Sequence, residues 1–343
     1  MHGVQTLRHN QQAYPRAPAP PSPSTDTLNA VRAMLIANPK ATSTTRRARD
    51  ILLRAFTGDL TVDLAETAHR GHAMELARKA AHEGYARVVV LGGDGTVNEA
   101  VNGLLADGPS PDLPVLAVVP CGSANVFARA LGLPGDPIGA TRQVLQGLRA
   151  GRHRTVGLGT ASLPGGPERY FTFNAGVGLD AEVVREVERQ RRKGGRAPAS
   201  LYVRTAIRHF FTGTDRRRPA LTLEQAGRPA KAGLFLAFVS NTSPWTFLGP
   251  LPVNPSPRAN FNKGLDVFAM RSLEAGPALA TVAQMLVART RPVQGRHVVN
   301  VHDAAEVTLR APRPVAYQLD GDYLGETPAI TFRAVPKAIR VVI

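Results

Sequence analysis

The sequence has 343 residues and one cysteine, so it is long enough for two domains and excludes an intrachain disulfide. No run approaches the roughly 20 apolar residues that a membrane-spanning helix needs, and the N-terminus lacks the apolar core of a signal peptide, so we expect a cytoplasmic protein. The formal net charge of +16 suits either an arginine-rich solvated surface or a surface that meets anionic lipid headgroups, and no zinc-finger, RNA-recognition or helix-turn-helix signature favours nucleic acid.

The first 150 residues predict a tail followed by an α/β domain. Residues 1–26 are polar and rich in proline, so we expect a disordered tail. Residues 27–150 alternate between strand and helix patterns, which favours a doubly wound, mostly parallel sheet with helices on both faces. The predicted strands cover 31–37, 60–64, 87–91 and 114–120, and the predicted helices cover 44–56, 71–82, 97–105, 126–131 and 136–150.

The turn Gly92-Gly93-Asp94-Gly95 joins the third predicted strand to a helix. Its glycines lack a Cβ, so a phosphate can approach the main chain closely at the positive end of the helix. Asp94 would repel a phosphate, which suggests a Mg²⁺ ion or a proton transfer at this site. Thr96 and Glu99 are three residues apart, as in a capping box that opens a helix. An ordinary glycine turn, with Asp94 as a helix cap, is the alternative interpretation.

A second strand–turn–helix unit follows at Cys121-Gly122-Ser123-Ala124-Asn125. Ser123 offers a hydroxyl donor to a phosphate, and Asn125 offers a side-chain cap to the next helix. We expect Cys121 to be a turn residue and not a nucleophile. Right-handed crossovers place both glycine turns at the carboxyl ends of parallel strands, where ligands bind in open α/β sheets.

Residues 151–343 predict a second, β-rich domain. A strand over 170–174 leads to the glycine-rich stretch Ala175–Asp180, and Asp180 can cap the helix that follows. A basic run then either is solvated or faces a membrane; it comprises Arg189, Arg191, Arg192, Lys193 and Arg196. Recurring short strand patterns favour a β-sandwich-like domain. They cover 221–223, 234–239, 265–270, 298–301, 307–309, 316–319, 330–332 and 339–342, with helices over 199–211 and 277–288.

The segment Gly92-Gly93-Asp94-Gly95-Thr96-Val97-Asn98-Glu99 closely resembles the signature of the diacylglycerol kinase catalytic-domain family, which includes soluble bacterial lipid kinases and the sphingosine and ceramide kinases. NAD kinases and phosphofructokinases carry related turns, so other motifs are needed to narrow the resemblance. These motifs cover nearly the whole chain after the tail. They are Asn38-Pro39, Gly122 with Asn125 and Phe127-Ala128-Arg129, Asn174 with Gly178 and Asp180, Asn241-Thr242-Ser243-Pro244, Gly264-Leu265-Asp266-Val267 and Asp320-Gly321-Asp322.

The resemblance implies a nucleotide in the cleft between the two domains and ATP and Mg²⁺ as the reactants. It also implies that Asp322 takes the proton from the lipid hydroxyl and that Asp94 acts in catalysis and holds the metal. The alternative for the Asp-Gly pair is a plain hairpin turn. The alternative for Asn38 is a plain strand-ending turn, and the alternative for Thr67 is a residue that only leads into the next helix. The implied nucleotide-binding residues are Asn38, Thr67, Gly92, Gly93, Asp94, Gly95, Thr96, Asn98, Glu99, Gly122 and Ser123.

Three substitutions separate this chain from the family pattern. Ser123 replaces a threonine and retains the hydroxyl, Val126 replaces a common aspartate, and Asp322 replaces a glutamate and is one methylene shorter. Some family members also bind a structural Mg²⁺ near the segment that matches Gly264-Leu265-Asp266-Val267. Since Asn262 and Lys263 occupy the preceding positions here, we expect that metal site to be absent.

The resulting prediction is an ATP-dependent lipid kinase, most simply one that converts diacylglycerol into phosphatidic acid at the inner face of the membrane. A kinase of another alcohol is the first alternative, with a sphingoid base, another lipid or NAD as the acceptor. A nucleotide-binding regulator without catalysis is the second, favoured by the substitutions at Val126 and Asp322. A nucleic-acid binder rests on charge alone and is not expected. A homodimer remains open.

Overall fold

The computed structural model describes residues 32–39, 41, 46–58, 61–192 and 220–343. The predicted tail and the predicted helix over 199–211 lie outside these residues, as do Lys193 and Arg196 of the basic run. No helix of the described part is long and apolar enough to cross a membrane. In chain order, the N-terminal part comprises β1 (Arg32–Ala37), α2 (Arg46–Thr57), β2 (Thr61–Glu66), α3 (His72–His82), β3 (Arg87–Gly92), α4 (Asp94–Leu104), β4 (Val115–Pro120), α5 (Val126–Ala130) and α6 (Pro137–Arg149).

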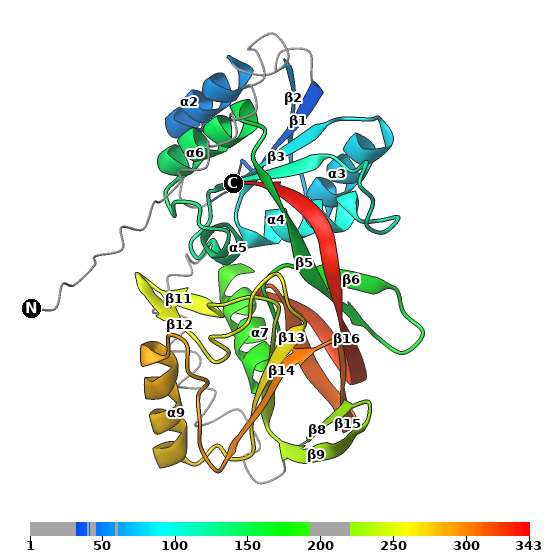
Figure 1. Ribbon diagram of the computed structural model, residues 1–343, viewed down its shortest axis with the longest axis vertical. Coiled ribbons are helices and arrows are strands. Elements are labelled where there is room, and N and C mark those ends of the chain that lie inside the picture. Colours follow the sequence, from blue (N-terminus) through cyan, green and yellow to red (C-terminus); the bar gives the residue numbers. More distant parts are fainter. Residues whose placement is uncertain (1–31, 40, 42–45, 59–60, 193–219) are drawn as a thin grey trace, which may run out of the picture.

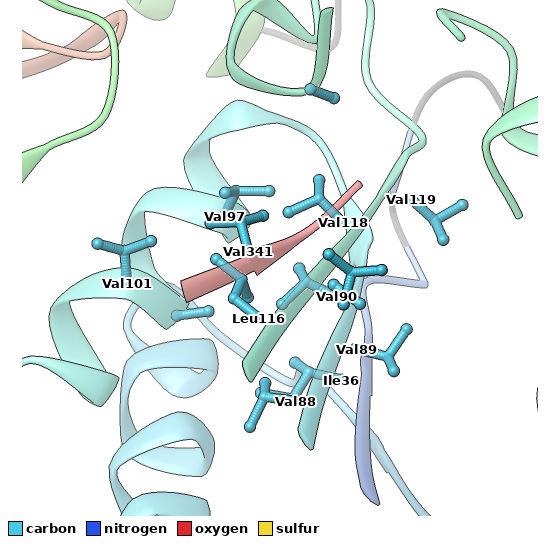
Figure 2. Packing of buried hydrophobic residues seen from close by; sticks show 14 of the residues in the cluster. Ile36, Val88, Val89, Val90, Val97, Val101, Leu116, Val118, Val119 and Val341 are labelled. Carbon is cyan, nitrogen blue, oxygen red and sulfur yellow. The ribbon is translucent and has the colours of Figure 1, made fainter. Parts of the chain in front are cut away.

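The N-terminal part is a parallel sheet between helices, as its alternating pattern predicts. The four strands lie in the order β4-β3-β1-β2. β3 is a run of β-branched and apolar residues that is almost wholly buried, which is typical of a strand covered on both faces. Figure 2 shows Val97 and Val101 of α4 packed against Leu116 and Val118 of β4. This packing fixes the start of α4 at the carboxyl end of β3.

The C-terminal part is rich in antiparallel strands, also as predicted. Its strands follow the order β14-β13-β10-β7-β15-β16, with β5, β6, β8 and β9 paired at the sides. The elements are β5 (His153–Ser162), β6 (Glu168–Phe171), β7 (Asn174–Gly178), α7 (Leu179–Arg192), β8 (Leu221–Gln225), β9 (Arg228–Leu234), β10 (Leu236–Ser240), β11 (Thr246–Leu248), β12 (Leu251–Val253), β13 (Leu265–Met270), α9 (Ala275–Val287), β14 (Val298–Ala304), β15 (Glu306–Leu319) and β16 (Asp322–Val342).

One long strand joins the two parts. β16 has 21 residues; its first half pairs with β15 and its second half pairs with β5. Near its end, Val341 pairs in parallel with Leu116 of β4. Figure 1 shows β16 running from the lower part of the molecule to the upper one. Apart from β11 and β12, which form a two-stranded sheet of their own, the described strands of both parts therefore belong to one 14-stranded sheet, and the turn before Asp322 has a fixed place relative to β4.

The glycine-rich stretch after Phe173 is a strand and not a loop. β7 is fully buried and pairs with β10 and β15. Gly176 is required by packing, since a Cβ there would overlap the carboxylate of Asp180. The glycine-rich pattern alone did not predict this strand, because glycines in a strand can serve close approach as well as turning. Likewise, four short predicted strands form the two long strands β15 and β16.

Candidate functional site

The two glycine turns of the N-terminal part pack directly on each other. The Cys121 amide donates to the Gly92 carbonyl over 2.8 Å. A Cβ on Gly122 would lie 2.7 Å from the Cα of Gly93, so neither turn has room for a side chain there. Gly92 has a similar role, because a Cβ would lie 2.6 Å from the Cβ of Thr96. These three glycines are explained by packing within the protein.

Gly95 differs from its neighbours because its side-chain position faces open space. A Cβ there would have only the two carboxylate oxygens of Asp322 within 4 Å, at 3.8 and 3.9 Å. Gly95 belongs to the first turn of α4, and Asp322 is the first residue of β16. Gly95 and Asp322 are 227 positions apart in the sequence (322 − 95), yet they border the same space. This is where the predicted phosphate turn meets the predicted base.

Asp94 lies at the centre of the paired turns. Its carboxylate accepts hydrogen bonds from the amides of Val126 and Phe127, at 3.1 and 3.2 Å, and so caps α5. Burial of the carboxyl raises the pKa of Asp94 to about 6, although these two amides act in the opposite direction. At neutral pH the group is therefore mostly ionised. The cap predicted from Asn125 is absent: Asn125 has a positive φ of 49°, and its side chain bonds both main-chain groups of Gly122.

The capping box predicted for Thr96 and Glu99 is wrong. Helix α4 already begins at Asp94, and no side chain bonds its N-cap, Gly93. The Glu99 carboxylate instead accepts from the amides of Gly71 and Ala73, at 2.8 and 3.2 Å. It thus caps the neighbouring helix α3 and fixes the loop before it.

The remaining predicted contacts of the nucleotide lie along the carboxyl ends of β1, β2 and β4. The Asn38 side chain donates to the Thr96 hydroxyl over 3.0 Å, which places it next to the first glycine turn. Thr67 is half-buried, and its amide donates to the carbonyl of Ala37 beside Asn38. Ser123 is exposed in the second glycine turn. All three therefore border the edge of the sheet that the predicted site requires.

The segment that carries Asp322 is a tight hairpin turn between β15 and β16. Leu319 pairs with Asp322, and both residues between them have positive φ, 50° for Asp320 and 81° for Gly321. This is the conformation that an Asp-Gly pair favours. The side chain of Asp322 is 27% exposed, and one of its oxygens lies 3.3 Å from the guanidinium of Arg70. Arg70 precedes α3, and the sequence pattern did not identify it.

Asp320 is a buried connector that the sequence analysis also missed. Its carboxylate accepts from the amides of three consecutive residues, 172–174, at 2.6, 3.0 and 3.1 Å, and from the Thr172 hydroxyl at 2.8 Å. A fifth donor is the Asn98 side chain of α4, at 2.8 Å. Asn98 also donates to the carbonyl of Tyr170 and accepts from Arg169. Asn98 therefore joins α4 to the hairpin turn.

A second buried acid supports the same turn from the other side. Gln318 donates to the Asp180 carboxylate over 2.9 Å, while its own oxygen accepts from the amide of Gly321 over 2.8 Å. Burial raises the pKa of Asp180 to about 6. The predicted cap is not confirmed: α7 begins at Leu179, Asp180 lies in its first turn, and the Asp180 carboxylate accepts from Gln318 of β15.

We expect Asp180→Asn to change the pH dependence of stability. Because the pKa of Asp180 is raised from 3.8 to about 6 by folding, the folded protein holds this proton more tightly than the unfolded chain does. The wild type therefore loses stability as pH rises through this window, and asparagine, which does not titrate, removes the loss. The free energy of unfolding of the variant relative to wild type should rise by roughly 2–3 kcal/mol between pH 4 and pH 6. Urea titrations at several pH values measure this difference, and a constant difference would contradict the assignment.

The segment at which some family members bind a structural Mg²⁺ has a different arrangement here. The Asp266 carboxylate accepts from the Asp303 amide at 3.0 Å and lies 2.7 Å from Nδ1 of His302. The ammonium of Lys263 lies 3.2 Å from the other ring nitrogen of His302. The described residues contain no group of three histidine, cysteine or acidic side chains that could hold a metal. This donor set, with a lysine inside it, does not fit the ion.

Comparisons with known proteins agree with the motifs. The family model described as the diacylglycerol kinase catalytic domain matches residues 32–160. A diacylglycerol kinase of Staphylococcus aureus (strain bovine RF122 / ET3-1) is 27% identical over 302 residues, 87% of this chain and 88% of that protein. A diacylglycerol kinase of Bacillus subtilis (strain 168) is 26% identical over 269 residues, covering 75% and 78%. A crystal structure of a diacylglycerol kinase from Bacillus anthracis str. Sterne has a similar fold, with a TM-score of 0.65 and 18% identity over 91% of this chain and 96% of that one.

Proposed function

We propose that the protein is an ATP-dependent lipid kinase, because residues 32–160 match the model of the diacylglycerol kinase catalytic domain. It transfers the γ-phosphate of ATP to a lipid hydroxyl, with diacylglycerol as the acceptor and phosphatidic acid as the product. The similarity to diacylglycerol kinases over 87% of the chain supports a lipid acceptor. The nucleotide lies along the carboxyl ends of β1–β4, and the acceptor enters from the side of the C-terminal part.

One observation carries this proposal: the open space beside Gly95 is bordered by the carboxylate of Asp322 and lies next to Arg70. Phosphoryl transfer needs a surface that accepts phosphate oxygens, a cation and an oriented base at one point. The glycine turn and the start of α4 supply the first, Arg70 the second and Asp322 the third. A nucleotide-binding regulator would need no carboxylate at this point.

The roles of these residues follow from their chemistry. Asp322 accepts the proton of the lipid hydroxyl. At the same time the hydroxyl oxygen forms a bond with the γ-phosphorus, and the bond between the γ-phosphorus and the bridging oxygen of the β-phosphate breaks. Arg70, now 3.3 Å from Asp322, pairs with the anionic phosphoryl group. Asp320 and Asn98 hold the hairpin turn against α4, so that the base keeps its place relative to Gly95.

Mg²⁺ fits the site in the manner usual for kinases, where one or two carboxylates and the substrate phosphates bind an ion that keeps several waters. Asp94 would hold it, together with the phosphates. Asp94 already accepts two amides, so it retains the remaining lone pairs of its carboxylate for the ion or for its bound waters. When bound, the ion neutralises the charge that develops on the phosphates.

The experiment that tests this function is transfer of radiolabelled γ-phosphate to a panel of acceptors: diacylglycerol, a sphingoid base, ceramide and NAD. We expect label in phosphatidic acid. Label in another product would replace the acceptor but retain the kinase, whereas ATP binding without any labelled product would favour the regulator. The arrangement of Gly95 and Asp322 gives no preference among the lipids, so the panel decides the acceptor.

A further inference from the structure

Helix α9 has an apolar face that is open to solvent. No charged residue occurs from Ala275 to Ala288. Leu279, Val282 and Val287 lie on one side of the helix and are 70%, 49% and 74% exposed. The other side is also apolar and buries Ala278 and Met285 against the C-terminal part. A surface helix of a soluble protein normally presents polar residues on its outer face, so the exposed face of α9 needs a partner.

The hairpin formed by β11 and β12 extends this face. β12 packs against α9, and Figure 1 shows the hairpin directly beside the helix. Leu251, at the start of β12, is 54% exposed. Asn254 fixes the helix to the hairpin, since its amide donates to the carbonyl of Met285 and its side chain to the carbonyl of Ala288, both over 2.9 Å. We call Leu251, Leu279, Val282 and Val287 the α9 surface.

The charges around the α9 surface identify its partner. Exposed arginines follow the helix at 289, 291 and 296, and Arg289 and Arg291 have no acidic partner among the described residues. Apolar side chains beside unpaired arginines match the boundary between acyl chains and anionic headgroups. A second copy of the same surface would bring like charges together on chains of formal charge +16, and Glu274 is the acid next to the helix. Charge complementarity therefore favours an anionic bilayer over self-association.

We propose that the α9 surface docks the protein on an anionic membrane, with Leu279, Val282 and Val287 in the headgroup–acyl boundary and the arginines on the headgroups. This surface contains none of the residues of the basic run, for which the sequence left both a solvated and a membrane-facing role open. In that run, Arg189 is bound to Glu186 within α7, and Lys193 and Arg196 lie outside the described residues.

Docking by this face delivers a lipid acceptor to the candidate site. It therefore deepens the proposed function and rests on it. A chain of contacts leads from α9 to the candidate site. Asn254 accepts from the Ser243 hydroxyl over 2.8 Å, and the amide of Trp245 donates to the carbonyl of Val253. On β11, the ring of Phe247 lies 3.1 Å from the guanidinium carbon of Arg129 on α5, the helix that Asp94 caps. The hairpin thus lies between the proposed membrane contact and the paired glycine turns.

The test is cosedimentation of the purified full chain with phosphatidylcholine vesicles, with and without phosphatidylglycerol. The variant Leu279→Ser/Val282→Ser/Val287→Ser should bind the anionic vesicles at least about tenfold more weakly than wild type, because it loses three inserted apolar side chains. Ile138→Ser is the matched control, since Ile138 is an equally exposed apolar residue on α6, at 62%. It should bind as wild type does. Arg289→Gln/Arg291→Gln should lose most of the preference for phosphatidylglycerol.

Equal vesicle binding by the triple variant and wild type would overturn the proposal, as would a wild type that binds no vesicles. A wild-type dimer that becomes monomeric in the triple variant, with unchanged vesicle binding, would assign the face to a second copy instead. A water-dispersed short-chain diacylglycerol separates this test from the test of the function. The triple variant should phosphorylate it normally. If wild type does not phosphorylate it either, the proposed function fails while the vesicle result still decides the docking.

Discussion

Replacing Asp322 by asparagine should slow phosphoryl transfer by ~10²–10⁴-fold, which is the usual contribution of a positioned general base. Affinity for Mg²⁺·ATP should change little, because the proposed role of Asp322 begins only when the acceptor hydroxyl is present. Asparagine has the same shape and keeps the tight turn after Gly321. The measurement is single-turnover phosphorylation of a short-chain diacylglycerol, beside calorimetric titration with ATP.

Two further variants sharpen this prediction. Asp322→Glu should retain substantial activity, because it restores a carboxylate one methylene longer, in a position that is partly open to solvent. Glu326→Gln is the matched control: Glu326 is an exposed acid on the same strand, paired with Arg185, and its loss should leave the rate unchanged. A wild-type single-turnover rate in Asp322→Asn would remove Asp322 from the proposed mechanism and leave Asp94 or water as the base.

Replacing Asp94 by asparagine should lower the rate of phosphoryl transfer by about 10²-fold or more. It should also weaken the metal-dependent binding of ATP. Charge stabilisation through a metal can be worth several kcal/mol. The fold should survive at some cost in stability, because asparagine keeps an oxygen for only one of the two amides at the start of α5 that the carboxylate accepts. Asparagine carries no charge, so it also avoids the cost of burying an ionised carboxylate, the same burial that raises the pKa of Asp94 to about 6. Steady-state kinetics at saturating Mg²⁺ and ATP, with a thermal melt of each variant, measure both effects.

The control for Asp94 is another aspartate that caps a helix. Asp136 accepts from the amide of Gly139 at the start of α6, over 2.7 Å, outside the candidate site. Asp136→Asn should lower stability modestly and leave turnover unchanged. If both variants lose only stability, Asp94 is a helix cap and the simple alternative for this residue is correct.

The local patterns of the sequence predicted most of the fold. Strands such as β3 are short runs of buried β-branched residues that end at glycines, and helices such as α3 and α6 have clear apolar faces, so each could be placed from a window of about a dozen residues. The sheet of the N-terminal part follows from their alternation. The pattern could not show that two pairs of short strands continue as β15 and β16, because a bulge and a continuing strand look alike in sequence.

The sequence patterns named residues that lie at the candidate site, but not the partners that these residues contact. The spacing of Thr96 and Glu99 fits a capping box, yet Glu99 caps α3, because the amides that donate to its carboxylate lie 26 and 28 residues earlier in the chain. Asp320 reads as a turn residue, and only the fold brings it the amides of residues 172–174. Arg70 stands in no motif, and its neighbour Asp322 comes from the other end of the sequence. Such contacts depend on how distant segments pack, which single-residue patterns do not encode.

The most direct test of the proposed site is calorimetric titration of Mg²⁺·ATP into Gly95→Ala. The new methyl group would occupy the space between α4 and Asp322 without touching another part of the protein, and alanine favours the helix, so stability should stay equal or rise by up to about 1 kcal/mol. Gly276→Ala is the control, since Gly276 of α9 also has open space around its side-chain position. We expect Gly95→Ala to bind ATP at least about tenfold more weakly, because the methyl group overlaps the phosphates, while Gly276→Ala binds it normally. Wild-type ATP affinity in a folded Gly95→Ala protein would show that the phosphates do not lie between Gly95 and Asp322.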